Sequence, residues 1–243
     1  MKLNTNSNIY TIVYAAVVVI IVAFLLAFAS SVLSGRSNAN EQNDKKKQIL
    51  ASLGERDVQD ADVQTTYEKY IMADMIINDK GEILNEGKDK DKDGFAVARK
   101  GISKDCLPVY KCMADSVEFY VIPLVGKGLW GGIWGYMAVN GDGKTVKGVY
   151  FSHESETAGL GSLIKDDVNF QLQFNDKLLY DSTWNVVLTL KKNGLADKQS
   201  QTECDGISGA TLTGNGVNNM IKEYLNLYKE FFRKNLEEKT VNQ

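Results

Sequence analysis

The chain has 243 residues, of which 44% are hydrophobic, so it can form a folded core and is not globally disordered. Its formal net charge is −3 and it carries no basic stripe, which excludes nucleic acid as an expected partner. His153 is the single histidine, so multi-histidine metal sites are excluded, and we predict no metal site. Cys106, Cys112 and Cys204 fit neither a CxxC metal pair nor a disulfide-dense scaffold. Cys106 and Cys112 can pair in an oxidising compartment, or all three can be free thiols.

The N-terminal segment has the composition of a membrane span. Residues 9–33 contain no charged side chain and exceed the roughly 20 residues that a helix needs to cross a bilayer. We therefore predict a short tail at residues 1–8 and a single transmembrane helix at residues 9–33. The alternative is a cleaved signal peptide, with Ala27-Phe28-Ala29 as a small-x-small cleavage site. The apolar run is longer than in most signal peptides.

The membrane orientation is indicated only by charge. Lys2 precedes the span, whereas Arg36 and residues 45–47, all lysines, follow it. Taken alone, the positive-inside rule favours a cytoplasmic C-terminal domain.

After the span, residues 34–43 are polar and predict a linker, and residues 44–243 predict one soluble domain. Within it, residues 44–53 predict a helix and residues 64–78 a helix that runs into a strand. Residues 79–94 predict a charged loop or hairpin, which contains the calcium-loop spacing D-x-D-x-D-G. The twelfth position of such a loop would be Lys100 instead of an acid, which favours a solvated turn.

Strand patterns dominate the middle of the chain. Residues 117–124 are apolar and predict a strand, and residues 125–135 are glycine-rich and predict a loop. Two further strands, residues 136–139 and 146–152, flank the hairpin turn Asn140-Gly141-Asp142-Gly143. Residues 184–191 predict another strand. The soluble part is therefore of the α+β class, with an antiparallel sheet and helices at both ends.

A C-terminal amphipathic helix is the clearest predicted element. Its apolar residues recur at spacings of three and four: Val217, Met220, Ile221, Tyr224, Leu225, Tyr228, Phe231 and Phe232. Thr213, Gly214 or Asn215 can cap its start.

Small, hydroxylic and glycine residues precede this helix, from Asp205 to Gly214. Backbone N–H groups and the helix dipole make such a helix start favourable for a phosphate group. An ordinary capped helix after a turn has the same composition, and physical reasoning alone favours that interpretation. The segment is not a Walker A loop, because no Gly-Lys-Ser/Thr follows.

The run Asp205-Gly206-Ile207-Ser208-Gly209-Ala210-Thr211 resembles the flavinylation motif of the FMN-binding domain family. In proteins with that motif a flavin transferase moves FMN from FAD onto the last threonine as a phosphoester. The resemblance implies that Thr211 carries covalent FMN and that Thr213 is a cap or a phosphate contact. Further cofactor contacts are expected from the rest of the segment: Asp205, Ser208, Gly209, Ala210 and Gly214.

Two other segments support the same family. Residues 153–161 are similar to the H-x-x-E-T-P-G-L-G stretch of FMN-binding domains, with Ala158 in place of the usual proline. Residues 126–130, Gly-Lys-Gly-Leu-Trp, resemble a loop of the C subunits of sodium-translocating NADH:quinone oxidoreductases. The resemblance extends from the N-terminal span to the last helix.

These segments supply the remaining expected cofactor contacts: Lys127, Trp130, His153, Glu156, Thr157, Gly159 and Leu160. Each has a plainer alternative. Trp130 or Leu160 can fill the core, Glu156 and Thr157 can cap a turn, His153 can be a structural hydrogen-bonding group, and Lys127 can be solvated.

The resemblance implies a redox subunit that relays single electrons through FMN and is not catalytically complete alone, so no catalytic residue is predicted. The implied partners are the other subunits of the membrane complex, the flavin transferase and membrane lipid. The implied location is the bacterial inner membrane, with the soluble domain in the periplasm, against the charge pattern. The alternatives are the G subunit of an ion-translocating ferredoxin:NAD oxidoreductase and a flavin-free, membrane-tethered binding module.

Overall fold

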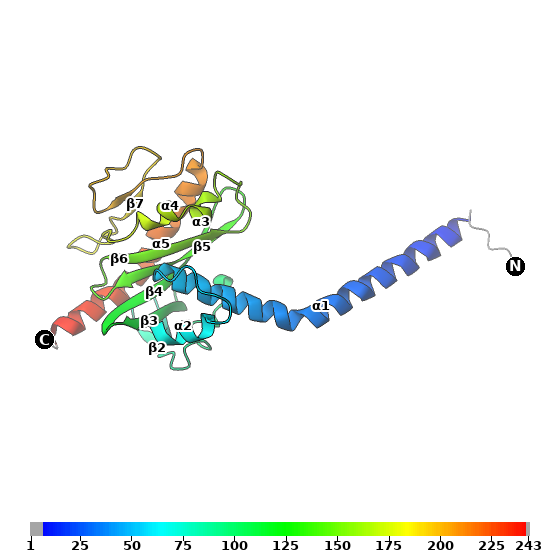
Figure 1. The fold of residues 1–243 in the computed structure, drawn as a ribbon, viewed down its shortest axis with the longest axis horizontal. Coiled ribbons are helices and arrows are strands. Elements are labelled where there is room, and N and C mark those ends of the chain that lie inside the picture. The colour runs from blue at the N-terminus through cyan, green and yellow to red at the C-terminus, as the bar shows by residue number, and fades with distance from the viewer. Residues whose placement is uncertain (1–6, 242–243) are drawn as a thin grey trace. The chain divides into compact units, whose positions relative to one another are not determined.

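A computed structural model of the chain describes residues 7–241, which divide into two compact units, Met1–Lys45 and Lys46–Gln243. The elements follow one another as α1 Asn8–Ser52, α2 Val63–Tyr70, β1 Ile71–Ile77, β2 Ile83–Asn85, η1 Arg99–Gly101, β3 Leu107–Ala114, β4 Val117–Lys127, β5 Gly132–Asn140, β6 Val146–His153, α3 Leu163–Asp166, α4 Val168–Leu172, β7 Thr189–Leu190, β8 Glu203–Cys204 and α5 Thr211–Val241 (Figure 1).

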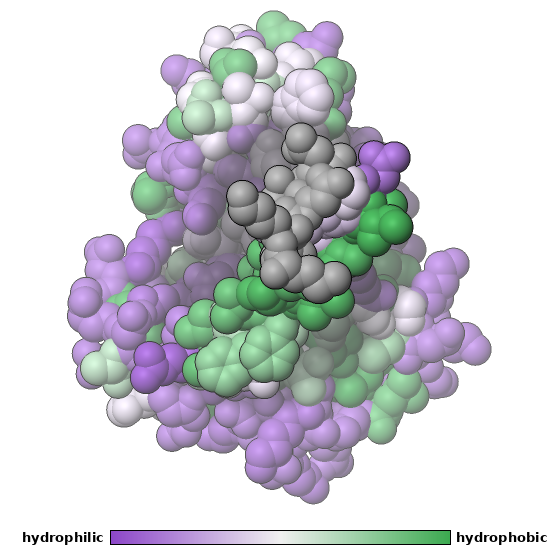
Figure 2. Space-filling view, turned by 90° about the vertical axis from the view of Figure 1, so that its right-hand side faces the viewer, coloured by the Kyte–Doolittle hydropathy of each residue, from purple (hydrophilic) through white to green (hydrophobic). Residues whose placement is uncertain are grey.

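The first unit consists of helix α1 up to Lys45, and it is long and apolar enough to cross a membrane. None of its most apolar stretch is buried, and Figure 2, which views the helix nearly end-on, shows hydrophobic side chains, in green, towards the viewer. The predicted linker, residues 34–43, is helical. That segment contains no proline and only one glycine, so no residue breaks the hydrogen-bonding pattern of the helix. The division into tail, span, linker and domain stays a prediction, and residues 1–6 of the tail lie outside the described residues.

The second unit is built on a six-stranded antiparallel sheet in the order β2-β1-β3-β4-β5-β6. Its longest pairing joins β4 to β5, from Phe119 opposite Asn140 to Lys127 opposite Gly132. The connecting loop is therefore residues 128–131, much shorter than the predicted loop at residues 125–135. The structure confirms the α+β class and the hairpin around residues 140–143.

Both faces of the sheet are buried, because successive side chains of a strand point to opposite sides. On β4, Tyr120 and Ile122 face one core, which α3, α4 and α5 cover. Phe119 and Val121 face a second core, which contains residues of α2 and of the last turn of α1 (Figure 1). The sheet thus forms the middle layer between two groups of helices.

Helix α5 packs along the first face with the predicted apolar side chains buried. The Tyr228 hydroxyl donates to the Pro108 carbonyl at 2.8 Å, which ties the helix to β3. Near its start the helix approaches β4 closely: a Cβ on Gly216 would collide with the backbone carbonyl of Lys127. Glycine at position 216 therefore allows the N-terminal turns of α5 to lie against the end of β4.

The predicted strand at residues 184–191 is largely wrong. The Asp181 carboxylate accepts hydrogen bonds from the backbone N–H groups of Thr183 and Asn185, at 2.8 and 2.9 Å, and closes a turn there. Trp184 has a left-handed φ of 62° in this turn. Within this segment only Thr189–Leu190 forms a strand, β7, which pairs in parallel with β8, and Val186 forms an isolated bridge with Tyr180.

The three cysteines are free thiols in the structure. Burial raises the pKa of Cys112 well above its ordinary value, and it raises that of Cys204 to about 12. Of the two alternatives for Cys106 and Cys112, the structure therefore has the unpaired one.

Candidate cofactor-binding site

Three loops that are distant in the sequence meet around a cavity of about 170 Å³. They are the β4–β5 loop, residues 128–131; the loop after β6, residues 154–162; and residues 205–210, which lead into α5. The side chains and backbone that line the cavity belong to Leu129, Glu156, Thr157, Leu160, Gly161, Gly209, Ala210, Thr211, Leu212 and Thr213. Many of the predicted cofactor contacts, together with the predicted attachment residue Thr211, thus surround one space.

Glu156 joins the β4–β5 loop and the loop after β6 to the start of α5. Its side chain is buried, with 8% of the residue exposed. One carboxylate oxygen, Oε2, accepts a hydrogen bond from the Thr213 hydroxyl at 2.6 Å. The other, Oε1, accepts one from the backbone N–H of Trp130 at 2.9 Å. The backbone N–H of Glu156 donates to Nδ1 of His153 at 3.1 Å, so His153 orders the turn that presents the carboxylate.

The negative charge of Glu156 is stabilised by hydrogen bonds from uncharged groups. Burial by itself raises its pKa, but the hydrogen bonds from Thr213 and from the backbone N–H groups of Trp130, Gly131 and Leu129 outweigh burial. The pKa of Glu156 is therefore below its ordinary value, and the group is an anion at neutral pH.

Two glycines leave the room that this carboxylate occupies. A Cβ on Gly161 would lie 2.5 Å from Oε2 of Glu156 and 2.7 Å from Oγ1 of Thr213. A Cβ on Gly128 would collide with Oε1 of Glu156. Any larger residue at either position would displace the carboxylate, so the glycines of both loops are required by packing.

The two threonines at the start of α5 differ in exposure. Thr211 is the first residue of the helix, is exposed and lines the cavity. Thr213 is 1% exposed, and its hydroxyl is committed to Glu156. The helix begins earlier than the predicted caps at residues 213–215, because the Gly214 N–H already donates to the Ala210 carbonyl at 2.8 Å.

Exposed apolar side chains lie in these loops and in the first turn of α5, and all of them except Trp130 line the cavity. The exposed fractions are 46% for Leu129, 67% for Trp130, 41% for Leu160 and 59% for Leu212. Trp130 and Leu160 therefore do not fill the core, which was the alternative for each. Gly209, with φ +73°, lies so close to Leu160 that an added Cβ would be 2.8 Å from its Cδ2.

Several predicted contacts lie outside the cavity lining. Oδ1 of Asp205 accepts a hydrogen bond from the Gly194 N–H at 2.7 Å, so this carboxylate holds the neighbouring loop. Lys127 and Ser208 are exposed, and Gly214 lies within the first turns of α5. Gly159 adopts a left-handed φ of 74° in the loop that carries Glu156.

Three lining residues were missed by the sequence prediction: Leu129, Gly161 and Leu212. The first two stand inside the segments that carry the family resemblance, so the motif itself could have included them. Leu212 offers no sequence signal, because it stands between two threonines and its exposure depends on where the helix begins.

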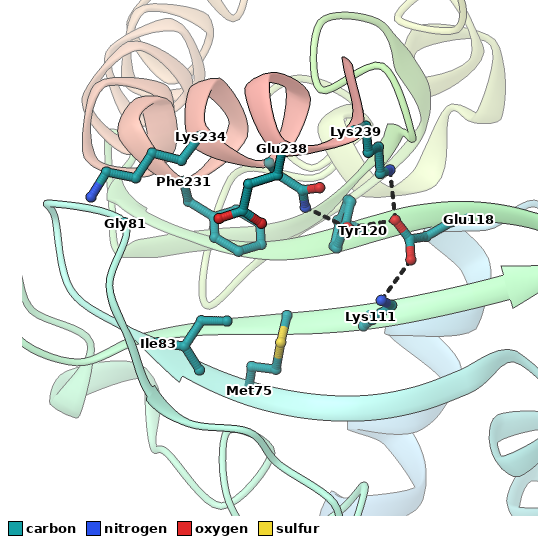
Figure 3. A pocket seen from close by; sticks show the side chains of 11 residues that line it. Met75, Gly81, Ile83, Lys111, Glu118, Tyr120, Phe231, Lys234, Glu238 and Lys239 are labelled. Carbon is teal, nitrogen blue, oxygen red and sulfur yellow. Dashed lines mark hydrogen bonds and ion pairs between the residues drawn. The ribbon is translucent and has the colours of Figure 1, made fainter. Parts of the chain in front are cut away.

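A second cavity, of about 260 Å³, lies between the end of α5 and the sheet (Figure 3). Of the two carboxylates that line it, Glu118 is bound by Lys111 on one side and by Lys239 on the other, each at 2.6 Å. The Tyr120 hydroxyl also donates to Glu118 at 2.6 Å. These charged groups satisfy one another, so they serve the packing of α5 and are not arranged for a cofactor.

The first cavity fits a flavin mononucleotide in its chemistry. The leading N–H groups of a 31-residue helix favour a phosphate, and the exposed leucines and tryptophan suit an apolar ring system. Comparison with known proteins identifies the same ligand: the FMN-binding domain family matches residues 128–226, which contain the three loops.

Relatives that match most of the chain identify its family more narrowly than the domain family does. The C subunit of the Na(+)-translocating NADH-quinone reductase of Haemophilus ducreyi is 32% identical over 239 residues, which cover 91% of each chain. That of Pseudomonas aeruginosa is 28% identical and covers 91% of this chain and 93% of its own. The chain belongs to the family of C subunits of Na(+)-translocating NADH-quinone reductases.

Solved structures of this family share the fold. The structure of the C subunit from Parabacteroides distasonis has a TM-score of 0.74 and 34% identity, and it covers 82% of this chain and 96% of its own. The Shewanella oneidensis NqrC structure has a TM-score of 0.69 and 25% identity, over 81% and 98% of the two chains. Of the functional alternatives, neither the G subunit nor the flavin-free binding module is favoured by these relatives.

Proposed function

We propose that the chain is the FMN-carrying redox subunit of a sodium-translocating NADH:quinone reductase, with the FMN joined to Thr211 by a phosphoester. The observation that carries the attachment site is the contrast between Thr211 and Thr213. Only the Thr211 hydroxyl combines exposure with a place at the cavity and at the helix start. The FMN supplies the uptake and release of single electrons, and the protein supplies binding and electrostatics.

Attachment would follow ordinary phosphoryl-transfer stoichiometry. The bond between Thr211 Oγ1 and the FMN phosphorus forms, the P–O–P bond of FAD breaks, AMP leaves, and the hydroxyl proton is lost. A transferase must reach this hydroxyl, and the exposure of Thr211 meets that need. Once attached, the phosphate would lie at the positive end of the α5 dipole.

The test is covalent flavin detected by fluorescence in a denaturing gel, after co-expression with a flavin transferase. We expect a fluorescent band for the wild type and for Thr213→Val, and none for Thr211→Val. Ser208→Ala is a second control, because Ser208 is exposed and does not line the cavity. A band that persists in Thr211→Val, or that is lost only in Thr213→Val, would reject the proposed site.

The other motif residues would hold the cofactor or the loops around it. Glu156, Thr157, Leu160 and the backbone of residues 209–210 line the cavity and would contact FMN directly. Trp130, which is exposed and follows the lining residue Leu129 in the β4–β5 loop, would pack on the flavin. His153 and Asp205 would act through the loops that their hydrogen bonds order.

The membrane placement is part of the same proposal. Residues 9–33 would span the bacterial inner membrane once, in contact with lipid, and residues 44–243 would form the periplasmic domain that meets the neighbouring proteins of the complex. Support comes from the apolar helix α1 and from the names of the relatives. In spheroplasts, added protease should digest the domain. Protection of the domain in intact spheroplasts would place it in the cytoplasm, as the charge pattern favours.

Retention of the anchor needs its own measurement. We expect the intact mass of the membrane-extracted protein to include residues 9–33. A mature protein that starts after Ala29 would instead support the signal-peptide alternative. Electron flow through the assembled complex would be coupled to sodium export, a property of the complex that this chain does not provide alone.

A further inference from the structure

The most unusual charge in the second unit is that of Glu156, because it lies in the cofactor cavity and has no cation beside it. The carboxylate is buried, and it lines the cavity together with Thr211. Among the residues that the structure describes, the ion pairs leave Glu156 out. Its hydrogen-bond donors are a hydroxyl and backbone N–H groups, which are dipoles without net charge.

This arrangement has an electrostatic consequence. A salt bridge would cancel most of the field of a carboxylate beyond a few ångströms, whereas dipoles leave its net charge in place. The Glu156 carboxylate itself is buried, so its field in the cavity is screened less by solvent and salt than that of a surface carboxylate. A group that gains electrons in this cavity would therefore do so next to a fixed negative charge.

We propose that Glu156 is a positioning residue whose uncompensated negative charge also lowers the reduction potential of the flavin held in this cavity. The inference rests on the proposed function, because it requires FMN at Thr211. Reduction adds electron density to the flavin, and a nearby anion disfavours the reduced forms relative to the oxidised form. The same carboxylate forms hydrogen bonds that position the loop of Trp130 and the start of α5. The group that lowers the reduction potential therefore also positions the parts of the site.

The decisive variant is Glu156→Gln, which removes the charge and keeps the shape. The Gln oxygen can accept from the Trp130 N–H, and the Gln amide can donate to the Thr213 hydroxyl, so both of these contacts can remain. Glu154→Gln is the matched control, because it removes the same charge from an exposed carboxylate of the same loop that does not line the cavity. The two variants therefore separate a buried charge at the cavity from a solvated charge on the same loop.

The experiment is a spectroelectrochemical titration of the full-length, detergent-extracted protein, made with the flavin transferase. We expect a more positive midpoint potential in Glu156→Gln than in the wild type, and a wild-type-like potential in Glu154→Gln. The difference for Glu156→Gln should persist when the salt concentration is raised, as for a charge that solvent does not screen. Circular dichroism and melting temperature verify that each variant is folded.

The outcomes separate the inference from the function on which it rests. Absence of covalent flavin in the wild type would reject the proposed function before any potential is measured. Flavin-loaded Glu156→Gln with an unchanged potential, or equal shifts in both variants, would overturn the role of the charge while leaving Thr211 in place. Loss of covalent flavin in a folded Glu156→Gln would also overturn it, because Glu156 would then serve attachment.

A second pair of variants covers the case in which Glu156→Gln does not fold. The side chains in Glu156→Asp and Glu156→Asn are both one methylene shorter than that of Glu156, and they differ from each other in charge. We expect the more positive potential in the Asn variant. Equal potentials in this pair would contradict the proposal.

Discussion

The hydroxyl of Thr213 and the carboxylate of Glu156, 57 residues apart in the sequence, form a buried hydrogen bond of 2.6 Å. This contact fastens the start of α5 to the loop that follows β6. It also withdraws Thr213 from solvent and leaves Thr211 as the exposed hydroxyl at the helix start. One hydrogen bond thus contributes to the architecture of the cavity and distinguishes Thr213 from Thr211, the residue that we propose carries the flavin.

Removal of this hydrogen bond should destabilise the second unit. Thr213→Val keeps the side-chain shape but leaves one oxygen of a buried carboxylate without its donor, which costs about 1.5–3 kcal/mol. Thr211→Val, at an exposed position, should change the free energy of unfolding by less than about 0.5 kcal/mol. Urea unfolding of both proteins without flavin measures the difference. Equal stabilities would show that the Thr213 hydroxyl contributes little.

Alanine at Gly161 should disturb the cofactor cavity. The new methyl group would lie 2.5 Å from the Glu156 carboxylate, so either the carboxylate or the loop must move. We expect a loss of about 2–4 kcal/mol in unfolding free energy and a weaker covalent flavin band. Gly101→Ala is the control, because the nearest atom to its added Cβ is the Val97 Cγ1 at 3.6 Å. A stable Gly161→Ala protein with full flavin loading would contradict this account of the glycine.

Glu118 should support stability in acid. Burial raises its pKa, but hydrogen bonds from Lys111, Lys239 and Tyr120 outweigh burial and bring the pKa to about 2. A carboxyl with a lowered folded-state pKa contributes stability above its unfolded-state pKa, and this contribution is lost as the pH falls towards 2.

Glu118→Gln should therefore cost on the order of 2 kcal/mol at pH 7 and progressively less below about pH 4. The measurement is denaturant unfolding from about pH 3 to about pH 7. Glu237→Gln is the control, because Glu237 forms a surface pair with Arg233 and is 61% exposed at the side chain. A penalty for Glu118→Gln that does not change with pH would argue against the linkage.

Asp74 should have the opposite pH dependence. It is fully buried in β1, one oxygen accepts from the backbone N–H groups of Asp93 and Phe95, and the other, Oδ1, has no hydrogen-bond partner among the described residues. Burial raises its pKa above the ordinary 3.8. The contribution of this group is thus fully present below pH 3.8 and is lost as the pH rises through the raised folded-state pKa.

Asp74→Asn keeps an acceptor for the two N–H groups and removes the titration. We expect the stability of the variant to fall less than that of the wild type as the pH rises from about 4 to about 8. Thermal melts across this range test the difference in slope. Parallel curves for the two proteins would show that Asp74 does not titrate in the folded state.

Much of the fold follows from local patterns. The periodic apolar residues from Val217 to Phe232 predicted α5, and the turn at residues 140–143 predicted its hairpin, because both signals are short-range and strong. The predictions that were wrong concern two segments in which polar residues determine the backbone conformation. Asp181 closes a turn where a strand was expected, and the polar segment 34–43 stays helical because it lacks a breaker.

The sequence by itself determined the α+β class, the apolar N-terminal segment and the family resemblance, and through the motif it predicted Thr211 as the attachment residue, which stays a prediction. The tertiary structure decided which motif residues share a cavity, and it placed Asp205 and Lys127 outside its lining. It also separated Thr211 from Thr213 by burial and made Glu156 the link between two loops and the start of α5. Burial and uncompensated charge arise only when segments distant in the sequence pack together, and no single segment contains that information.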